Sequence, residues 1–190
     1  SVMEPALVQA SAVLHSSRCK MLVEETWGAV AKDLEGNGVK LFLRIFEISP
    51  DALQLFKFKD DEPLAESAAL RKHALLFMSV LGKVITCLDK VETVVPMLRD
   101  LGEKHAIVGV TPNHLIIMGN SLFWMLKQVL GGAWNQEVKE AWIEAYASVQ
   151  SVFQDSMLKL TSDIAPRNRS KTPKGDDRNQ TLVQETWRLV

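Results

Sequence analysis

The stretch QEVKEAWIEAYASVQSVFQDSMLKL, residues 136–160, decides the fold class. Its apolar residues recur at steps of three and four, which draws one stripe along a helix of about six turns. The stripe consists of Val138, Ala141, Trp142, Ala145, Tyr146, Val149, Val152, Phe153, Met157 and Leu160. Such a stripe is typical of a helix that buries one face in a core.

Helical patterns and helix-ending residues recur along the chain, whereas strand signals are nearly absent. Thr111-Pro112 is typical of an N-cap followed by proline at the first helical position, and Gly131-Gly132 ends that helix. Gly36-Asn37-Gly38 is expected to separate two helices, and Ser49-Pro50 to end the second of them. The sequence predicts an all-α fold with helices at 20–34, 39–48, 50–55, 64–89, 92–104, 112–130 and 136–160.

Composition limits the classes of partner. Of 190 residues, 47% are hydrophobic and 24% charged, and the net charge is -1, so nothing points to nucleic acid or an anionic membrane. The sequence contains no run of about 18 apolar residues, so it predicts no membrane-spanning helix. The two cysteines, Cys19 and Cys87, are too few for a disulfide framework. They form either one disulfide bridge or none, in which case both are free thiols. No signal peptide is visible; a cytoplasmic location is favoured, and an extracellular one requires an upstream signal peptide.

Two of the four histidines lie on predicted apolar faces. His73 stands four residues before Phe77, and His105 continues the Leu98–Leu101 stripe, whereas His114 is expected to be exposed. A lone histidine on an apolar face is most often a satisfied core residue, and that interpretation stays open for each. Two facing histidines on successive core helices favour a shared metal, and imidazole is the common protein ligand of haem iron. No H-E-x-x-H, C-x-x-C or Glu-x-x-His motif favours another metal site.

Several segments, in order, resemble the globin family and neuroglobins in particular. They are Trp27, NGVKLFLRIFEISPDALQLF at 37–56, LGEKHAIVGV at 101–110 and AWIEAYASV at 141–149. The resemblance implies a globin fold of about seven to eight helices in a three-over-three sandwich around haem b. It implies His105 as the proximal iron ligand, with its other ring nitrogen donating to a backbone carbonyl on the preceding turn. It implies His73 as the distal residue.

The resemblance also implies the residues that contact the cofactor. They are Phe42, Phe56, Phe58, His73, Phe77, Leu101, His105, Val110, Leu115 and Tyr146. For the apolar ones, plain helix-bundle core is the competing interpretation. The Tyr146 hydroxyl is expected to tie the last helix to the turn after the proximal histidine. Phe58 and Leu76 replace polar neuroglobin residues near the haem propionates, and Lys72 and Lys104 are no better anchors than other surface lysines.

The function implied is reversible binding of O2, CO or NO. We expect His73 and His105 both to bind iron when no gas is present, which suits redox, sensing or scavenging roles. The alternative is a five-coordinate oxygen storage or transport domain. Nitric-oxide dioxygenation or nitrite reduction is expected only as a side activity, because no general acid beyond His73 and no reductase domain is visible. A haem-free regulatory domain is the remaining interpretation.

A short repeat predicts tandem domains. LVQETWRLV, residues 182–190, matches LVEETWGAV, residues 22–30, at six of nine positions. The expected organisation is an N-terminal extension or linker at 1–19, a globin domain at 20–160, a linker at 161–180 and the truncated first helix of a second globin-like repeat at 181–190. Neighbouring globin domains are the expected partners, and residues 182–190 or the N-terminal extension could form a dimer contact.

Overall fold

The computed structural model describes residues 17–164, and these residues contain helices and turns but no strand. The all-α prediction is therefore confirmed for this part of the chain. The α-helices are α2 Ser17–Val30, α3 Leu34–Ile48, α4 Pro50–Leu53, α5 Ala68–Thr86, α6 Val91–Ile107, α7 Pro112–Leu130 and α8 Gln136–Ile164. Short 3-10 turns cover Ala31–Asp33, Leu64–Glu66 and Gly131–Ala133. The expectations for residues 1–16 and 165–190 lie outside the described residues.

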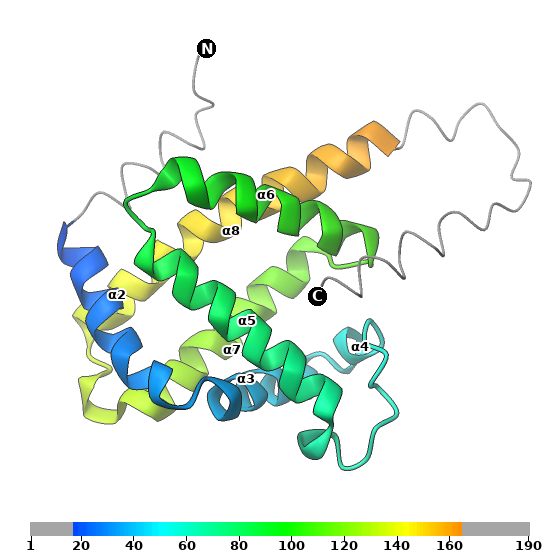
Figure 1. Ribbon diagram of the computed structural model, residues 1–190, viewed down its shortest axis with the longest axis horizontal. Helices are drawn as coiled ribbons and strands as arrows, with labels where there is room; N and C mark the ends of the chain where they lie inside the picture. The colour runs from blue at the N-terminus through cyan, green and yellow to red at the C-terminus, as the bar shows by residue number, and fades with distance from the viewer. Residues whose placement is uncertain (1–16, 165–190) are drawn as a thin grey trace, which may run out of the picture.

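The helices pack in pairs that come from distant parts of the chain. Helix α6 lies along α8 and α3 along α5, while α2 packs on the first part of α8 (Figure 1). In Figure 1, α5 and α6 cross in front of α7 and α8. Helix α5 therefore rests on α3, and α6 rests on the longer helix α8.

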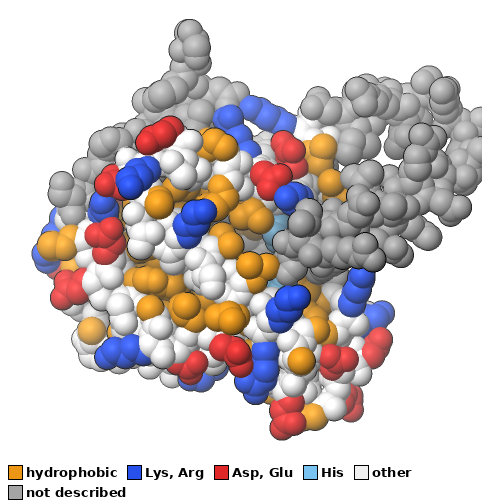
Figure 2. Space-filling model, viewed as in Figure 1, with side chains coloured by type: hydrophobic (Ala, Val, Ile, Leu, Met, Phe, Trp, Pro, Cys, Tyr) orange, Lys and Arg blue, Asp and Glu red, His pale blue; other side chains and the backbone are white. Residues whose placement is uncertain are grey.

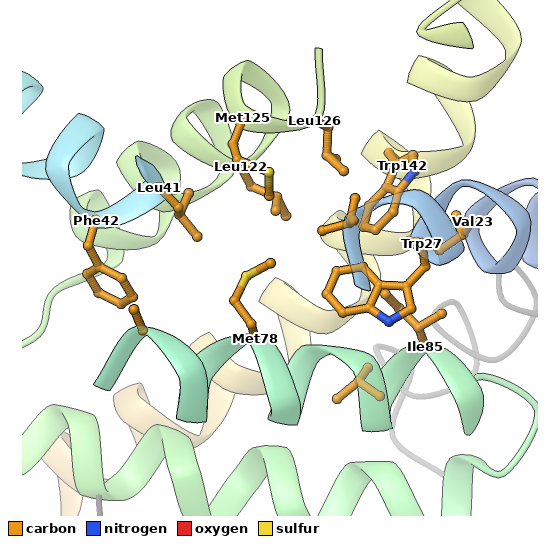
Figure 3. Packing of buried hydrophobic residues seen from close by; sticks show 14 of the residues in the cluster. Val23, Trp27, Leu41, Phe42, Met78, Ile85, Leu122, Met125, Leu126 and Trp142 are labelled. Carbon is orange, nitrogen blue, oxygen red and sulfur yellow. The ribbon is translucent and has the colours of Figure 1, made fainter. Parts of the chain in front are cut away.

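The core is centred on two tryptophans. Trp27 of α2 and Trp142 of α8 pack with ring centroids 6.3 Å apart, and the indole N–H of Trp142 donates to the Thr26 hydroxyl over 2.9 Å. Figure 3 shows Leu41, Met78, Leu122 and other apolar side chains pointing into the same volume. Because the indole N–H has a partner, Trp142 can be almost completely buried without an unsatisfied donor.

Helix α7 matches its predicted limits, whereas the predicted break at Gly36–Gly38 is wrong. Thr111 caps α7, Pro112 opens it, and Gly131 follows with φ +53°. Helix α3, by contrast, begins at Leu34, because the Asp33 side chain accepts the Gly36 N–H over 2.9 Å. Gly38 is inside the helix, where a Cβ would lie 2.9 Å from the Ala74 carbonyl oxygen. The glycine permits close packing of α3 on α5 and does not break the helix.

Several other helix boundaries also differ from the prediction. The helix expected at 64–89 begins only at Ala68, because the Ser67 hydroxyl caps it by accepting the Leu70 N–H. Cys19, expected before the first helix, is buried inside α2, and no disulfide joins Cys19 to Cys87. Helix α8 continues to Ile164, four residues past the expected end.

Within residues 17–164, no single helix is long and apolar enough to cross a membrane. Only the segments Glu92–Ile107 and Pro112–Ala133 taken together reach that length and composition, and they are bent by 117°.

Candidate functional site

His105, in the last turn of α6, is held in a fixed orientation. Its Nδ1 lies 2.7 Å from the carbonyl oxygen of Leu101, four residues earlier, and its ring meets the ring of Phe153 on α8 at a centroid distance of 5.2 Å. Since a carbonyl only accepts, Nδ1 carries the proton and donates. The tautomer therefore leaves the Nε2 lone pair free to bind a metal.

His73, on α5, is held by aromatic contacts. The rings of Phe42 and Phe56 each meet its ring nearly edge-on, with centroids 5.0 Å away and interplanar angles of 74°. Within the described part of the chain, the His73 imidazole makes no hydrogen bond. Contacts of this kind contribute about 0.5–1.5 kcal/mol each and fix the ring less firmly than a hydrogen bond to the backbone. The distal ring is thus positioned but not tethered.

Both imidazoles are neutral at neutral pH. Burial, with a smaller contribution from the charge of His105, lowers the pKa of His73 to about 4. Burial also lowers the pKa of His105, although its hydrogen bond to Leu101 opposes this effect. His73 lies on α5 and His105 on α6, the two helices that cross in front of α7 and α8 in Figure 1. A neutral imidazole is the form that binds iron.

The donor set fits a haem better than a bare metal ion. Residues 17–164 hold no group of three or more His, Cys, Asp or Glu side chains that could bind a metal. Two opposed imidazoles fit a metal that brings its other ligands with it, as haem iron does. Leu76, three residues after His73 on α5, is 37% exposed, and Figure 2 shows hydrophobic surface near histidine on this face. The residues present therefore fit the cofactor.

Of the apolar residues expected at the site, Phe42 and Phe56 contact His73, and Phe77 contacts Phe42. Phe42 contacts Phe56 and Phe77 as well as His73, so the three phenylalanines form one edge-to-face cluster on the distal side. Phe58 is an exception, since it is 6% exposed and stacks on Phe56 with ring centroids 4.8 Å apart. It also packs on Phe46 of α3, so its position corresponds to the core interpretation. On the proximal side, the partly buried residues are Leu101, Val110 and Leu115.

Tyr146 joins α8 to α7 at a point that differs from the expectation. Its hydroxyl donates to the carbonyl of Leu115, inside α7, over 2.5 Å and does not reach the turn that follows His105. Gly119 makes this contact possible, because a Cβ at that position would lie 2.5 Å from the Tyr146 ring. Burial raises the pKa of Tyr146, so the hydroxyl stays protonated and remains a donor. Tyr146 has a structural role in this arrangement.

His114, expected to be exposed, caps helix α7. The Thr111 N–H donates to its Nδ1 over 3.0 Å, and Nε2 lies 3.7 Å from a carboxylate oxygen of Asp51 on α4. Only 16% of its side chain is exposed. The signal in the sequence is its position three residues after the N-cap Thr111, where a glutamate or glutamine usually completes the capping box.

The lysines considered as anchors for the cofactor differ from each other. Lys104 donates to Asp100, one turn earlier, over 2.8 Å, whereas Lys72 is exposed on α5. The neighbouring Arg71 is paired with Glu35 of α3 over 2.9 Å. The ion pairs of Lys104 and Arg71 brace α6 and α5 at the surface, and in water each contributes little to stability.

Comparison with known proteins agrees with this architecture. The family model "Globin" matches residues 39–153. Neuroglobin from Tetraodon nigroviridis is 32% identical over 154 residues, which cover 79% of this chain and 97% of that protein. Neuroglobin from Danio rerio is 31% identical over 140 residues, which cover 72% and 88%. A crystal structure of a hexacoordinated haem protein from an anhydrobiotic tardigrade superposes with a TM-score of 0.70 at 21% identity, covering 75% of this chain and 95% of that one. The chain belongs to the globin family and has the globin fold.

Proposed function

We propose that the chain binds haem b between α5 and α6, with His105 as the proximal and His73 as the distal iron ligand, and binds diatomic gases reversibly. The observation that carries the proposal is the tether of His105. Its Nδ1 donates to the carbonyl of Leu101, so Nε2 is available to a metal. Haem supplies an iron centre that binds O2, CO or NO and changes oxidation state.

The two histidines have different tasks in this proposal. His105 holds the iron, and its backbone hydrogen bond raises the basicity of the ring and prevents rotation. His73 competes with external gas for the sixth position, so the apparent gas affinity falls with the fraction of molecules in which His73 is detached. Phe42 and Phe56 keep water away from the His73 ring and favour its neutral form. The likeness to neuroglobins and to a protein described as hexacoordinated supports this competition.

A protein of this kind suits redox, sensing or gas-scavenging roles, because the internal ligand limits bulk gas delivery. The alternative is a five-coordinate oxygen storage or transport unit, in which His73 only donates a hydrogen bond to the bound gas.

The visible absorption spectrum of the haem-loaded protein, reduced with dithionite without oxygen, tests the proposal. Sharp, well-separated α and β bands are expected if both histidines bind iron. A single broad band would overturn the six-coordinate state and favour the storage or transport alternative. Absence of a Soret band after reconstitution with haemin would overturn haem binding itself.

A further inference from the structure

The segment 50–56, which begins with helix α4, brings Phe56 to the distal side of the site. Its backbone is a continuous series of turns, in which the N–H groups of residues 54, 55 and 56 each donate to the carbonyl three residues earlier, over 3.0, 3.2 and 3.0 Å. At the end of the segment, the ring of Phe56 meets the ring of His73 at a centroid distance of 5.0 Å. A displacement of Asp51, near the start, is therefore passed along the turns to the distal histidine.

The segment 109–114 leaves the proximal side of the site and enters helix α7. The N–H of Val110 donates to the carbonyl of His105 over 3.0 Å, so this segment is bonded to the last turn of α6. At its other end, His114 is the third residue of α7 and belongs to the capping box at the start of that helix. The segment is thus held at both ends by hydrogen bonds.

Asp51 of the first segment and His114 of the second face each other. The Thr111 N–H donates to Nδ1 of His114 over 3.0 Å, so the ring proton lies on Nε2, the reverse of the tautomer of His105. Nε2 lies 3.7 Å from one carboxylate oxygen of Asp51, whose other oxygen accepts the Ser49 hydroxyl. The Ser49 hydroxyl, and to a smaller extent His114, lower the pKa of Asp51, so this carboxylate is charged at neutral pH. The N–H edge of an imidazole therefore faces a negative charge.

Leu55 and Gly109 form a second contact between the same two segments. A Cβ at Gly109 would lie 3.5 Å from Cδ2 of Leu55, so the leucine side chain lies over this glycine. Gly109 has a φ of +93°, which residues with a Cβ rarely adopt, and the turn after α6 depends on it. Because Leu55 is four residues after Asp51, the two contacts hold both ends of the segment 50–56, whereas one contact alone would let it pivot.

We propose that the contact between Asp51 and His114 positions Phe56 and thereby sets how readily His73 detaches from haem iron. The inference rests on the proposed function, in which His73 is the displaceable ligand. Of the two rings that hold His73, Phe42 lies inside α3 and is 3% exposed, whereas Phe56 is only partly buried and follows the short helix α4. Phe56 is therefore the ring whose position depends on this contact, and Asp51 and His114 are positioning residues.

Two conservative variants remove the contact and keep the neighbouring hydrogen bonds. Asp51→Asn loses the charge and retains an oxygen for the Ser49 hydroxyl. His114→Gln loses the imidazole and retains an acceptor for the Thr111 N–H, because glutamine at this position also completes a capping box. The matched control is Glu47→Gln, which removes a carboxylate that Arg44 pairs with on the surface of α3.

Carbon monoxide binding to the reduced, haem-loaded chain measures the detachment of His73, since the observed rate levels off at the detachment rate constant at high gas concentration. Asp51→Asn and His114→Gln should each raise this plateau by about two- to five-fold, the size expected for a partly exposed charge contact. The double variant should exceed neither single variant, because losing one partner already abolishes the contact. A plateau that is unchanged or lower, or a double variant that multiplies the two effects, would overturn the proposal.

Hydrogen–deuterium exchange of the full chain as purified tests the contact without gas binding. The amides of residues 54–56 should exchange about two- to five-fold faster in both variants and at the original rate in Glu47→Gln. Unchanged exchange in the two variants would overturn the role of the contact, and faster exchange with an unchanged plateau would overturn its effect on His73. Absence of a plateau in the original chain would instead contradict the proposed function, and the effect on His73 would fail with it.

Discussion

The proximal and distal sides of the site hold the same side chain by different means. His105 donates to a backbone carbonyl of its own helix over 2.7 Å and packs on Phe153, so its ring has one orientation. His73 is surrounded by the edges of Phe42 and Phe56 and, among the described residues, its imidazole makes no hydrogen bond. A backbone hydrogen bond is directional, whereas aromatic contacts permit small movements of the ring. In the proposed function, this difference makes His105 on α6 the permanent ligand and His73 on α5 the displaceable one.

Replacing the proximal histidine should have the largest effect. His105→Ala removes the proposed ligand that is held by a backbone hydrogen bond. Replacing a residue behind a metal ligand typically lowers metal affinity about 10–100-fold, so removing the ligand itself should accelerate haem loss to a scavenging protein by at least about 100-fold. His114→Ala is the matched control, since it removes another partly buried histidine that caps α7. Unchanged haem retention in His105→Ala would contradict the assignment of the proximal side.

Replacing the distal histidine should leave haem bound but change its reactivity. In His73→Leu the internal competitor is absent, so the reduced spectrum should change from two sharp bands to one broad band. Carbon monoxide should bind at least about 10-fold faster, because binding no longer requires that a histidine first detach from the iron. Stopped-flow mixing measures the rate. A rate and spectrum equal to those of the original protein would mean that His73 is not an iron ligand.

Two glycines extend the comparison to the helices behind each histidine. A Cβ at Gly102 of α6 would lie 2.5 Å from the Phe153 carbonyl oxygen of α8, and one at Gly38 would lie 2.9 Å from the Ala74 carbonyl oxygen of α5. Each alanine substitution should lower stability by about 1–3 kcal/mol, measured by denaturant unfolding. Gly102→Ala should accelerate haem loss, whereas Gly38→Ala should change carbon monoxide binding more than haem retention.

Gly28→Ala is the control for this pair, because nothing lies within 4 Å of a Cβ there and the residue is exposed on α2. It should raise stability by about 0.4–1 kcal/mol through loss of freedom in the unfolded chain. If the two buried glycines exchanged their effects, with Gly38→Ala releasing haem and Gly102→Ala altering gas binding, the division between tethered and displaceable sides would be wrong.

Removal of haem is expected to have its smallest effect on the reactivity of the cysteines, which lie away from both histidines. Burial and the nearby Glu144 raise the pKa of Cys19 to about 11, so at pH 8 almost all of this thiol is protonated. Iodoacetamide should therefore label Cys87 at least about 10-fold faster than Cys19. Removal of haem should hardly change the labelling of Cys19, because the contacts of α2 with α8 lie away from the site. Fast labelling of Cys19 would show that this packing opens when haem leaves.

The sequence predicted the helices that local chemistry delimits. Helix α7 begins at Pro112 and ends before Gly131, because proline and glycine act on their own backbone. The Gly36–Gly38 break was predicted wrongly because Asp33 supplies a cap and Ala74 demands a small residue, and only the second is a long-range cause. Ser67 and the His114 cap follow known capping patterns and were within reach of the sequence.

The residues of the candidate site could be named from the sequence, but the contacts that hold each of them could not. The positions of His73 and His105 follow from helical periodicity and the resemblance to globins. That Phe58 packs behind Phe56, and that Tyr146 reaches Leu115 across Gly119, depends on how three helices meet. The hydrogen bond of His105 to a carbonyl one turn earlier was implied by the resemblance to globins, whereas the purely aromatic surroundings of His73 depend on contacts between helices.

The rate of carbon monoxide binding to the reduced protein, measured over a wide range of gas concentrations, tests the displaceable distal ligand most directly. If His73 must detach before gas binds, the observed rate should level off at high concentration, at the rate constant for His73 detachment, and His73→Leu should remove that plateau. A rate that rises linearly with carbon monoxide in both proteins would contradict the account and leave the sixth position open.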